Sequence, residues 1–336
     1  MQKITVTAPA NIAFIKYWGN TDDNLPLNSS ISMTLDHCMT TTTAEHTDAQ
    51  ENSILIADDQ DVFHELSTAD IKGKKAYEQV ERIRNMSGTK DFLKITTKNS
   101  FPSNTGIASS ASGFAALTAA AVLAYGMNDF FEDKKELSKL VRQSGSGSAA
   151  RSVYGGFVEL LTGKNSEDAY AVQLADEKHW GLCDIVAIVN GSSKKISSSE
   201  GHRSARTSPY FETRLAEMDS RINLTREAIK EKDFEKLGIA TERDTISMHM
   251  IMMSSQHPLY YWESGTIEVM KHVIAWREQE HIQIYFSIDA GANVHVICEE
   301  KNVDEIEIRL NALDSVIKTI SNRPTTGVHT ISDFTT

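Results

Sequence analysis

The segment with the clearest capacity to bind an anion spans residues 99–113 and reads NSFPSNTGIASSASG. Pro102 and Gly106 precede a run of serines, and a helical apolar pattern begins directly after them. Small residues let the backbone approach an anion, and the free N–H groups of a helix N-terminus attract it. The segment lacks the G-K-[S/T] ending of a Walker loop, so it predicts a phosphate site of another kind. Serine is also a preferred helix cap, so an ordinary helix start is the alternative.

A lysine lies within an apolar stretch near the start of the chain, where residues 8–19 read APANIAFIKYWG. In an extended strand, Ile12, Phe14, Lys16 and Trp18 would share one face. An ammonium group between apolar neighbours must find an anion or reach water. Lys16 is therefore a candidate anion ligand, and the alternative is an edge-strand lysine whose ammonium reaches solvent.

A second stretch of small polar residues, 144–152, reads SGSGSAARS. Alternating serine and glycine place hydroxyl groups beside unhindered amides, as in an anion-binding nest. Arg151 follows Ser148 by three residues, so one helical turn would place both on the same face. A guanidinium there can hold a carboxylate through two parallel hydrogen bonds. The alternative is a flexible Gly/Ser loop with a solvated arginine.

An aspartate follows directly after a strand-like run late in the chain, where residues 288–293 read IDAGAN. Aspartate before glycine is common in turns, so Asp289 has an ordinary structural interpretation. If Asp289 faces the predicted phosphate site, its carboxylate could accept a proton from a substrate hydroxyl group.

The overall composition limits the kinds of partner. The chain has 336 residues, 40% of them hydrophobic, and a formal net charge of −12, which disfavours general binding to nucleic acid or to anionic membranes. The three cysteines, Cys38, Cys183 and Cys298, lie far apart, which indicates a reducing compartment rather than a disulfide framework or a zinc site. No basic-apolar leader and no apolar run of about 18 residues is evident, so we expect a cytoplasmic protein.

The hydrophobic pattern predicts the elements that must position these candidates. Before residue 190 the expected strands are 3–45 with a turn near 22–24, 92–98, 153–161 and 183–190, and the expected helices are 69–87, 108–125 and 133–144. Beyond it the expected helices are 208–230, 233–254, 258–280 and 302–313, and the expected strands are 282–288, 293–298 and 315–320. This order predicts an α+β chain with two domains, residues 1–190 and 191–336, without a Pro/Gly-rich linker at the boundary.

Several of these motifs together resemble a known enzyme family. The loop at 99–113 looks like the ATP loop of the GHMP kinase superfamily. APANIAFIKYWG, NSSISMTL, SGSAARS followed by YGGF, KKISSSEGH and DAGAN occur in family order from residue 8 to about residue 293. This ordered set resembles the diphosphomevalonate decarboxylase family. One such motif would be weak evidence, whereas the ordered set is strong evidence.

The resemblance implies a fold and an activity. The implied GHMP kinase fold joins an N-terminal α/β domain of ribosomal-protein-S5-like type to a C-terminal ferredoxin-like α+β domain, with the active site in the cleft between them. The implied reaction uses ATP and Mg²⁺ to phosphorylate the 3-hydroxyl of 5-diphosphomevalonate. Phosphate and CO₂ then leave, and isopentenyl diphosphate remains for isoprenoid biosynthesis. The implied partners are a small-molecule substrate and a second copy of the chain, since family members are commonly homodimers.

The resemblance also implies roles for individual residues. Asp289 would orient or deprotonate the 3-hydroxyl, Arg151 would hold the substrate carboxylate, and Lys16 would balance charge on the transferring phosphoryl group. The implied substrate-binding residues are Tyr17, Trp18, Gly19, Asn20, Lys75, Ser146, Gly147, Ser148, Arg151, Ser198 and Thr207. The implied ATP-binding residues are Asn99, Pro102, Gly106, Ala108, Ser109, Ser110 and Ser112. The sequence does not identify the metal ligands.

One position departs from the family pattern in a way that bears on the substrate. The family usually reads Lys-Tyr-Trp-Gly-Lys, whereas Asn20 stands at the fifth position here, so one cation near the 5-diphosphate is missing. A charge-assisted contact is worth roughly 1.5–3 kcal/mol. The alternative substrate is therefore 5-phosphomevalonate, with isopentenyl phosphate as the product. Lys75, Arg203 or Arg206 could equally supply the missing charge.

Two further functions remain as alternatives. A related kinase would phosphorylate the 3-hydroxyl without decarboxylation, and a ligand sensor would bind ATP and substrate without turnover. The presence of both Asp289 and Arg151 favours the complete reaction. Residues 248–253, which carry four methionines around His249, have helical spacing and are expected to fill a core rather than bind a metal.

Overall fold

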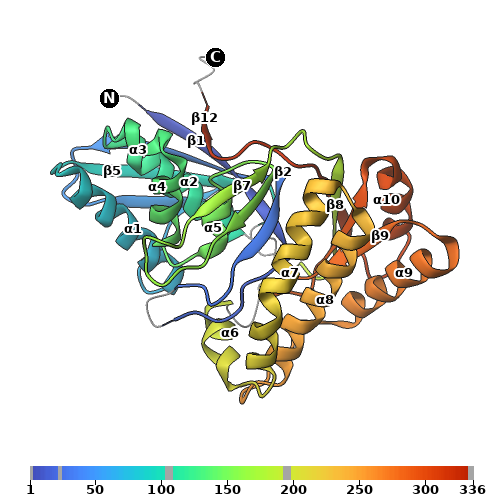
Figure 1. The fold of residues 1–336 in the computed structure, drawn as a ribbon. Coiled ribbons are helices and arrows are strands. Elements are labelled where there is room, and N and C mark those ends of the chain that lie inside the picture. Colours follow the sequence, from blue (N-terminus) through green and yellow to red (C-terminus); the bar gives the residue numbers. More distant parts are fainter. Residues whose placement is uncertain (1–2, 22–24, 103–108, 192–197, 332–336) are drawn as a thin grey trace.

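The structure is a computed structural model that describes residues 3–21, 25–102, 109–191 and 198–331 (Figure 1). Its strands are β1 (Ile4–Ile15), β2 (Ser30–Thr47), β3 (Ser53–Ala57), β4 (Phe63–Glu65), β5 (Phe92–Asn99), β6 (Phe157–Leu160), β7 (Ala171–Ala175), β8 (Leu182–Ile188), β9 (Ile284–Ser287), β10 (Val294–Glu299), β11 (Lys318–Asn322) and β12 (His329–Thr330). Its α-helices are α1 (Ile71–Ser87), α2 (Ser109–Ala124), α3 (Asn128–Glu132), α4 (Lys134–Arg142), α5 (Gly147–Arg151), α6 (Ser198–Ser204), α7 (Phe211–Glu231), α8 (Phe234–Met253), α9 (Ser264–Glu280) and α10 (Val303–Asn311). Two 3₁₀ helices are η1 (Ala205–Thr207) and η2 (Glu300–Asn302). Within the described ranges, no helix is long and apolar enough to cross a membrane.

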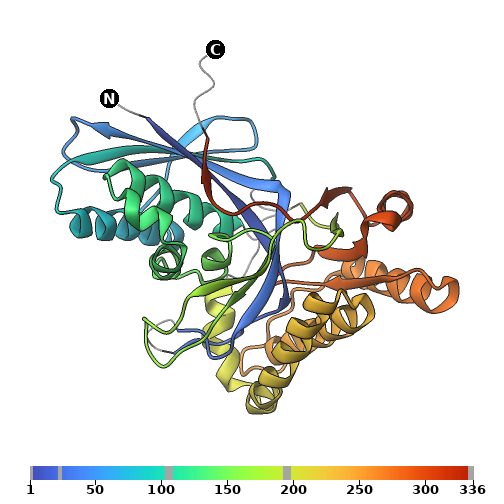
Figure 2. The ribbon, with the colours of Figure 1, turned by 45° about the horizontal axis from the view of Figure 1, so that its top comes forward.

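The larger sheet is built around the long strand β2. Its strand order is β12-β1-β2-β5-β3-β4, and β6 and β7 continue from β2. The first part of β2 pairs with β6 and the second part with β5, while β1 runs along the other edge. Figures 1 and 2 show helices α1 to α4 gathered on one face of this sheet. The alanine-rich helix α2 is buried along most of its length, because small side chains let it pack closely against β1 and β2.

The smaller sheet has the strand order β11-β8-β10-β9. One face packs against α9 and α10, with residues such as Ile185, Phe286 and Val296 in the core between them. The opposite face shares a core with β1, β2, α7 and α8. Helices α7 and α8 lie side by side, between the larger sheet and the last part of the chain (Figure 1). Strand β8 lies before residue 190 in the sequence but pairs with β10 and β11, which come from the last part of the chain. The division into domains 1–190 and 191–336 stays a prediction.

A register shift between β1 and β2 divides β1 into two parts that pack in different cores. Pro9 pairs with Met39 and Ala10 pairs with Leu35, so the extra residues at the shift, 36–38, belong to β2. Before the shift, Val6 and Ala8 pack in the core with α1 and α2. After it, Ile12 and other residues pack in the core with α7 and α8. The same strand therefore contributes to both cores, and its end lies at the junction between the two sheets.

The predicted α+β architecture is confirmed, and most predicted elements occur within a few residues of their expected bounds. The stretch 3–45 divides into β1 and β2, as expected from its turn signals. One detail is wrong: β1 ends at Ile15, so Lys16 does not continue the strand face of Ile12 and Phe14. The short elements β3, β4, β7, α3 and α5 were not predicted, because segments of three to five residues carry too little periodicity.

The contact between α8 and β9 yields a stability prediction. A Cβ atom added at Gly238 would lie 2.0 Å from Cδ2 of Tyr285. The Tyr285 ring is held by Phe234, at a centroid distance of 5.3 Å, and by the guanidinium of Arg277 at 4.5 Å. Because the ring has little room to move, we expect Gly238→Ala to lower the free energy of unfolding by about 1–3 kcal/mol. Urea denaturation measures this change.

The matched control is Gly113→Ala in α2. Among the residues that the structure describes, no atom lies within 4 Å of a Cβ at Gly113. Alanine is the better helix former, so this variant is expected to gain about 0.5–1 kcal/mol. Equal effects of the two substitutions would contradict the close packing of α8 on β9.

Candidate active site

Lys16 lies at the junction of the two sheets with its ammonium group buried. Nζ donates hydrogen bonds to the carbonyl oxygen of Ala13 at 2.8 Å and to Oγ of Ser287 at 2.6 Å. A longer contact reaches Oγ1 of Thr245 at 3.4 Å. Asp289 Oδ1 lies 3.9 Å from Nζ, so the ammonium faces a carboxylate from the smaller sheet. The side chain is only 4% exposed, which excludes the edge-strand lysine that reaches solvent.

The charge of Lys16 depends on its surroundings. Burial lowers the pKa of Lys16, because an apolar environment penalises the ammonium form. The carboxylates of Asp289 and Asp244 oppose this effect and raise the pKa, whereas the guanidinium groups of Arg214 and Arg151 lower it further. The ammonium form therefore depends on acidic neighbours contributed by the C-terminal half of the chain.

Arg151 is a second buried cation, at the end of α5. Its Nε donates to Ser32 Oγ at 2.8 Å, its Nη1 to Ser30 Oγ at 2.6 Å, and its Nη2 to Asn11 Oδ1 at 3.0 Å. The guanidinium is 4% exposed, so the solvated arginine is excluded. Asn11 also donates to the carbonyl oxygen of Ser148, which fixes the start of α5 against β1. Within the part of the chain that the structure describes, the hydrogen-bond partners of this guanidinium are all neutral.

The carboxylate of Asp289 interacts electrostatically with both cations, Lys16 and Arg151. It follows β9, and its carboxylate raises the pKa of both Lys16 and Arg151 against the lowering effect of burial. Its side chain is 26% exposed, whereas those of Lys16 and Arg151 are almost fully buried. Asp289 is therefore the member of the three with access to an incoming hydroxyl group, and the three together can bind an anion beside a proton acceptor.

Aromatic rings surround the residues that follow Lys16. The rings of Tyr17 and Trp18 stack on the imidazole of His202, at centroid distances of 4.9 and 4.4 Å. Nδ1 of His202 accepts a hydrogen bond from the N–H of Gly19 at 3.0 Å. Burial, and then the nearby Lys75 ammonium, lower the pKa of His202 to about 4, so the ring is neutral at pH 7. Close packing holds these rings in place, since a Cβ at Gly201 would lie 2.3 Å from Cζ2 of Trp18.

The Gly/Ser segment approaches the same region. The N–H of Gly147 donates to the Tyr17 hydroxyl at 3.1 Å, and Ser146 Oγ lies 3.1 Å from Ser148 Oγ. Gly145 has a φ of +85°, and Lys75 Nζ lies 3.5 Å from its carbonyl oxygen. Burial, and then the like charge of Arg203, lower the pKa of Lys75. Lys75 and Arg203 therefore provide positive charge beside the aromatic group.

Asn20 and Thr207 differ in their surroundings. Asn20 forms an isolated β-bridge with Pro26, and its Oδ1 is buried without a hydrogen-bond partner in the part of the chain that the structure covers. Thr207 lies in η1, is exposed, donates to the carbonyl oxygen of Ser204 and accepts from the N–H of Gln256. Among the described residues, no hydrogen bond links Thr207 to Lys16, Arg151 or Asp289, and its substrate role stays a prediction.

The structure covers the predicted ATP loop in part. Gly106 and Ala108 lie outside the described residues, and so does the side chain of Ser198. Ser109 and Ser110 lie in the first turn of α2 and are partly exposed. Pro102 is the last described residue before this helix. Ser112 is fully buried, and its Oγ lies 2.7 Å from Oγ1 of Thr40, which donates to Asn99 Oδ1 at 2.6 Å. The ATP contacts of all these residues stay predictions.

The residues present fit ATP and Mg²⁺. The 16-residue helix α2 presents its N-terminus with two serine hydroxyl groups, which suits a phosphate group. Among the described residues, no group of three or more His, Cys, Asp or Glu could hold a metal by itself. Mg²⁺ usually binds through one or two carboxylates together with substrate phosphates, so a sparse set of protein donors suits Mg²⁺ that arrives with a nucleotide.

Some residues of this site were not singled out in the sequence. Asn11, Ser30 and Ser32 lie within two of the quoted motifs, and the spacing of Ser30 and Ser32 already predicts a shared strand face. Ser287 lies two residues before Asp289, on the strand that leads to it. His202 ends the quoted motif KKISSSEGH, but its contacts with Tyr17 and Trp18 depend on the tertiary fold and could not be predicted from the sequence.

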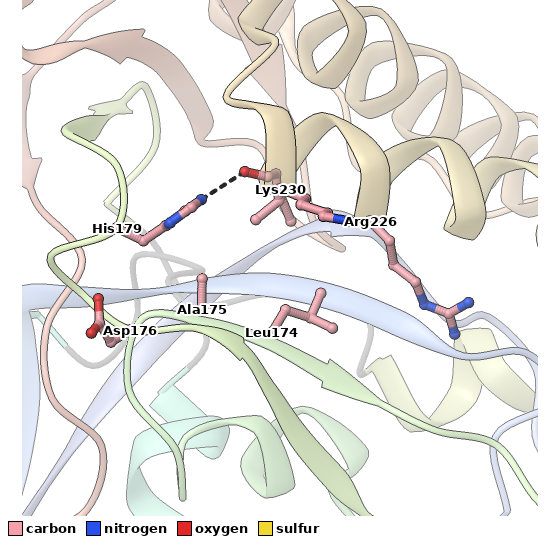
Figure 3. Close-up of a pocket in the computed structure, with 7 residues that line it drawn as sticks. Leu174, Ala175, Asp176, His179, Arg226 and Lys230 are labelled. Atoms are coloured by element: carbon pink, nitrogen blue, oxygen red, sulfur yellow. Dashed lines mark hydrogen bonds between the residues drawn. The ribbon is translucent and has the colours of Figure 1, made fainter.

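A separate surface groove, of about 460 Å³, lies between β7 and α7 (Figure 3). In that view His179 points to the carbonyl oxygen of Ile229, which it contacts through Nε2 at 2.8 Å. Arg226 pairs with the buried Glu159 through two hydrogen bonds of 2.7 and 2.6 Å. Since these polar groups are already paired, the groove does not offer a second catalytic arrangement.

Two family models match most of the chain. The model described as the diphosphomevalonate decarboxylase-like N-terminal domain matches residues 8–171, and the mevalonate 5-diphosphate decarboxylase C-terminal domain matches residues 184–331. The diphosphomevalonate decarboxylase of Candida albicans is 37% identical over 91% of this chain and 87% of its own length. The phosphomevalonate decarboxylase of Haloferax volcanii is 32% identical over 91% of both chains.

A solved structure is similar over nearly the whole chain. It is MDDEF in complex with MVAPP, AMPPCP and magnesium, with a TM-score of 0.87 and 31% identity over 98% of this chain and 99% of that chain. The ordered motifs, the junction of Lys16, Arg151 and Asp289, and these similarities lead to one conclusion. The chain belongs to the diphosphomevalonate decarboxylase family.

Proposed function

We propose that this protein is an ATP-dependent decarboxylase that converts 5-diphosphomevalonate and ATP into isopentenyl diphosphate, ADP, phosphate and CO₂. The observation that carries the proposal is the buried guanidinium of Arg151, whose hydrogen-bond partners among the described residues are the neutral side chains of Asn11, Ser30 and Ser32. A buried cation without a carboxylate partner is costly unless it binds an anion. The substrate carboxylate is the anion that this reaction must hold.

The first chemical step requires a proton acceptor next to a cation. Asp289 is exposed enough to contact the 3-hydroxyl, and it lies 3.9 Å from the Lys16 ammonium. Asp289 orients that hydroxyl group and accepts its proton as the oxygen attacks. The Lys16 ammonium balances negative charge that gathers beside it, and its contacts with Ser287 and Ala13 fix its position. ATP supplies the phosphoryl group, and Mg²⁺ neutralises the phosphate charge.

The second step requires a negative side chain near the tertiary carbon of the substrate and a positive side chain at its carboxylate. When the 3-phosphate leaves, positive charge develops at a tertiary carbon, and the Asp289 carboxylate stabilises it electrostatically. Arg151 holds the substrate carboxylate until the C–C bond breaks and CO₂ departs. The electron pair of that bond becomes the new double bond, so no redox cofactor is required.

The binding roles of the remaining residues form part of the same proposal. The 5-diphosphate end would lie against Tyr17, the backbone after it, Ser146 to Ser148 and Lys75, where the structure gathers aromatic rings, amides and positive charge. The nucleotide would lie at the N-terminus of α2. We further propose a homodimer in the cytoplasm and the two domains 1–190 and 191–336.

A second substrate, 5-phosphomevalonate, is favoured by one observation. Asn20 places a neutral side chain where the family usually has lysine, and a family relative at 32% identity is a phosphomevalonate decarboxylase. Lys75 and Arg203 lie beside the same region and can supply charge for the longer diphosphate. The diphosphate is therefore the primary proposal, and the monophosphate is the alternative.

The first of three predictions about catalysis concerns the substrate. The protein with ATP and Mg²⁺ should release ADP and CO₂ in equal amounts from 5-diphosphomevalonate, at a kcat/KM at least about tenfold above that for 5-phosphomevalonate. An extra charge-assisted contact of about 1.5 kcal/mol corresponds to that factor. A coupled ADP assay and CO₂ trapping measure the two products. ADP without CO₂ would contradict the decarboxylase, and a reversed preference would establish the monophosphate alternative.

The second prediction concerns Asp289. Asp289→Asn should lower kcat for ADP release and CO₂ release together by about 10²- to 10⁴-fold, because proton acceptance precedes phosphoryl transfer. The control is Asp176→Asn in the groove of Figure 3, which should leave both rates unchanged. If ADP release survives in Asp289→Asn while CO₂ release is lost, Asp289 acts only after phosphoryl transfer.

The third prediction concerns Asn20. Asn20→Lys should lower the KM for 5-diphosphomevalonate by about tenfold and change the KM for 5-phosphomevalonate less, because a new cation favours the larger negative charge. Asn20→Gln, which lengthens the side chain without charge, is the control. An equal change for both substrates would place the side chain of residue 20 away from the terminal phosphate.

A further inference from the structure

The main-chain groups of Lys16 are bound by side chains rather than by the sheet. The β1–β2 ladder ends at the pair Ile15–Ile31, so the buried N–H and C=O of Lys16 need other partners. The N–H donates to Oδ2 of Asp244 at 2.8 Å. The carbonyl oxygen accepts from Nη2 of Arg214 at 2.9 Å and from Nδ2 of Asn28 at 3.1 Å. A carboxylate thus binds the N–H of Lys16, and a guanidinium binds its carbonyl oxygen.

Asp244 and Arg214 also form an ion pair with each other. Nη2 of Arg214 lies 2.9 Å from Oδ1 of Asp244, and the two side chains are 1% and 0% exposed. Arg214 comes from α7 and Asp244 from α8, so the pair joins two helices to the end of β1. A buried ion pair is often no more stabilising than apolar residues of the same volume. Its position on Lys16 therefore indicates a role beyond general stability.

Five charged or titratable side chains from different elements act electrostatically with Lys16. They are Asp289 after β9, Asp244 and His249 of α8, Arg214 of α7 and Arg151 of α5. Asp244 raises the pKa of Lys16 and Arg214 lowers it. His249 is fully buried, and burial lowers its pKa to about 3, so it is neutral over the working pH range. Within the pair, each charge offsets the other at Lys16.

We propose that Arg214 and Asp244 are positioning residues that hold the Lys16 main chain at the end of β1 and thereby aim its ammonium group at the reacting centre. This inference rests on the proposed function, because it assigns the ammonium of Lys16 to the transferring phosphoryl group.

The chain contains a matched control pair on the same helix. Arg226 of α7 binds the buried Glu159 of β6 through two hydrogen bonds, at 2.7 and 2.6 Å. This pair also joins α7 to the larger sheet, but no hydrogen bond or ion pair between described residues links it to Lys16. Glu159→Gln should therefore lower the free energy of unfolding without changing the pH dependence of the reaction.

The test compares the alkaline fall of kcat in two variants. Asp244→Asn removes a negative charge that favours the Lys16 ammonium, so the rate should fall at lower pH than in the wild type. Arg214→Gln removes a positive charge that disfavours the ammonium, so the rate should fall at higher pH. A displaced ammonium should also lower the maximal kcat by about 10- to 100-fold in both variants, with little change in the KM for ATP.

Conservative variants separate position from charge. Arg214→Lys keeps the charge but loses the planar guanidinium, whose Nη2 binds the Lys16 carbonyl oxygen while Nη1 binds the Asp244 carbonyl oxygen. We therefore expect kcat to fall about tenfold while the pH profile stays that of the wild type. Urea denaturation confirms that each variant is folded before its rate is measured. If a variant does not fold, the conservative pair Arg214→Lys and Asp244→Glu provides the kcat comparison.

The outcomes are distinct. A lower kcat in Arg214→Lys with a wild-type pH profile, together with opposite shifts in the two charge variants and no shift in Glu159→Gln, supports the proposal. Shifts in the same direction, or a wild-type kcat in Arg214→Lys, overturn it and leave the ion pair as a stabilising contact. A wild-type protein that releases neither ADP nor CO₂ would instead overturn the proposed function, which separates the two failures.

Discussion

The arrangement of the two sheets depends on the burial of one ammonium group, that of Lys16, at the junction between them. An ammonium out of water is stable only when hydrogen bonds and opposite charge replace its hydration. At Lys16 these come from both parts of the chain: Ala13 lies on β1, whereas Ser287 and Asp289 lie on and after β9. Lys16 is therefore correctly surrounded only when the two sheets are packed together. The β1–β2 ladder ends at the pair Ile15–Ile31, so Lys16 lies just beyond the ladder, at that junction.

A second buried cation, Arg151, provides positive charge for the anionic substrate of the proposed reaction. The chain as a whole carries a formal charge of −12, which repels anions at long range. Arg151 overcomes this locally, because its guanidinium is held by Asn11, Ser30 and Ser32 rather than by a carboxylate that would neutralise it. Held in a water-poor site, a fixed cation interacts with a bound anion more strongly than a surface lysine would. Local placement, not net charge, sets the preference for an anionic substrate.

Local patterns in the sequence predicted the fold well but described the site only in part. The expected helix 233–254 closely matches α8 (Phe234–Met253), because its periodicity extends over five turns. Arg151 and Asp289 were identified from their motifs, yet sequence spacing alone could not show that Lys16 leaves the strand and is buried. Arg214 and Asp244 were missed for a physical reason. Their partner Lys16 lies 198 and 228 residues away along the chain, and no local pattern records such a contact.

In the proposed mechanism, chemistry and recognition use different parts of the chain. The proposed reacting groups lie at the junction of the two sheets, where packing and hydrogen bonds fix their positions before substrate arrives, as electrostatic stabilisation of a transition state requires. The 5-phosphate end would instead meet residues after Lys16, with the neutral Asn20 in place of a cation and with charge supplied by Lys75 and Arg203. Under this proposal, a substitution there would change which phosphate is bound without moving Lys16, Arg151 or Asp289. Such a separation would account for the similarity of this chain, over nine-tenths of its length, to relatives named for diphosphomevalonate and for phosphomevalonate.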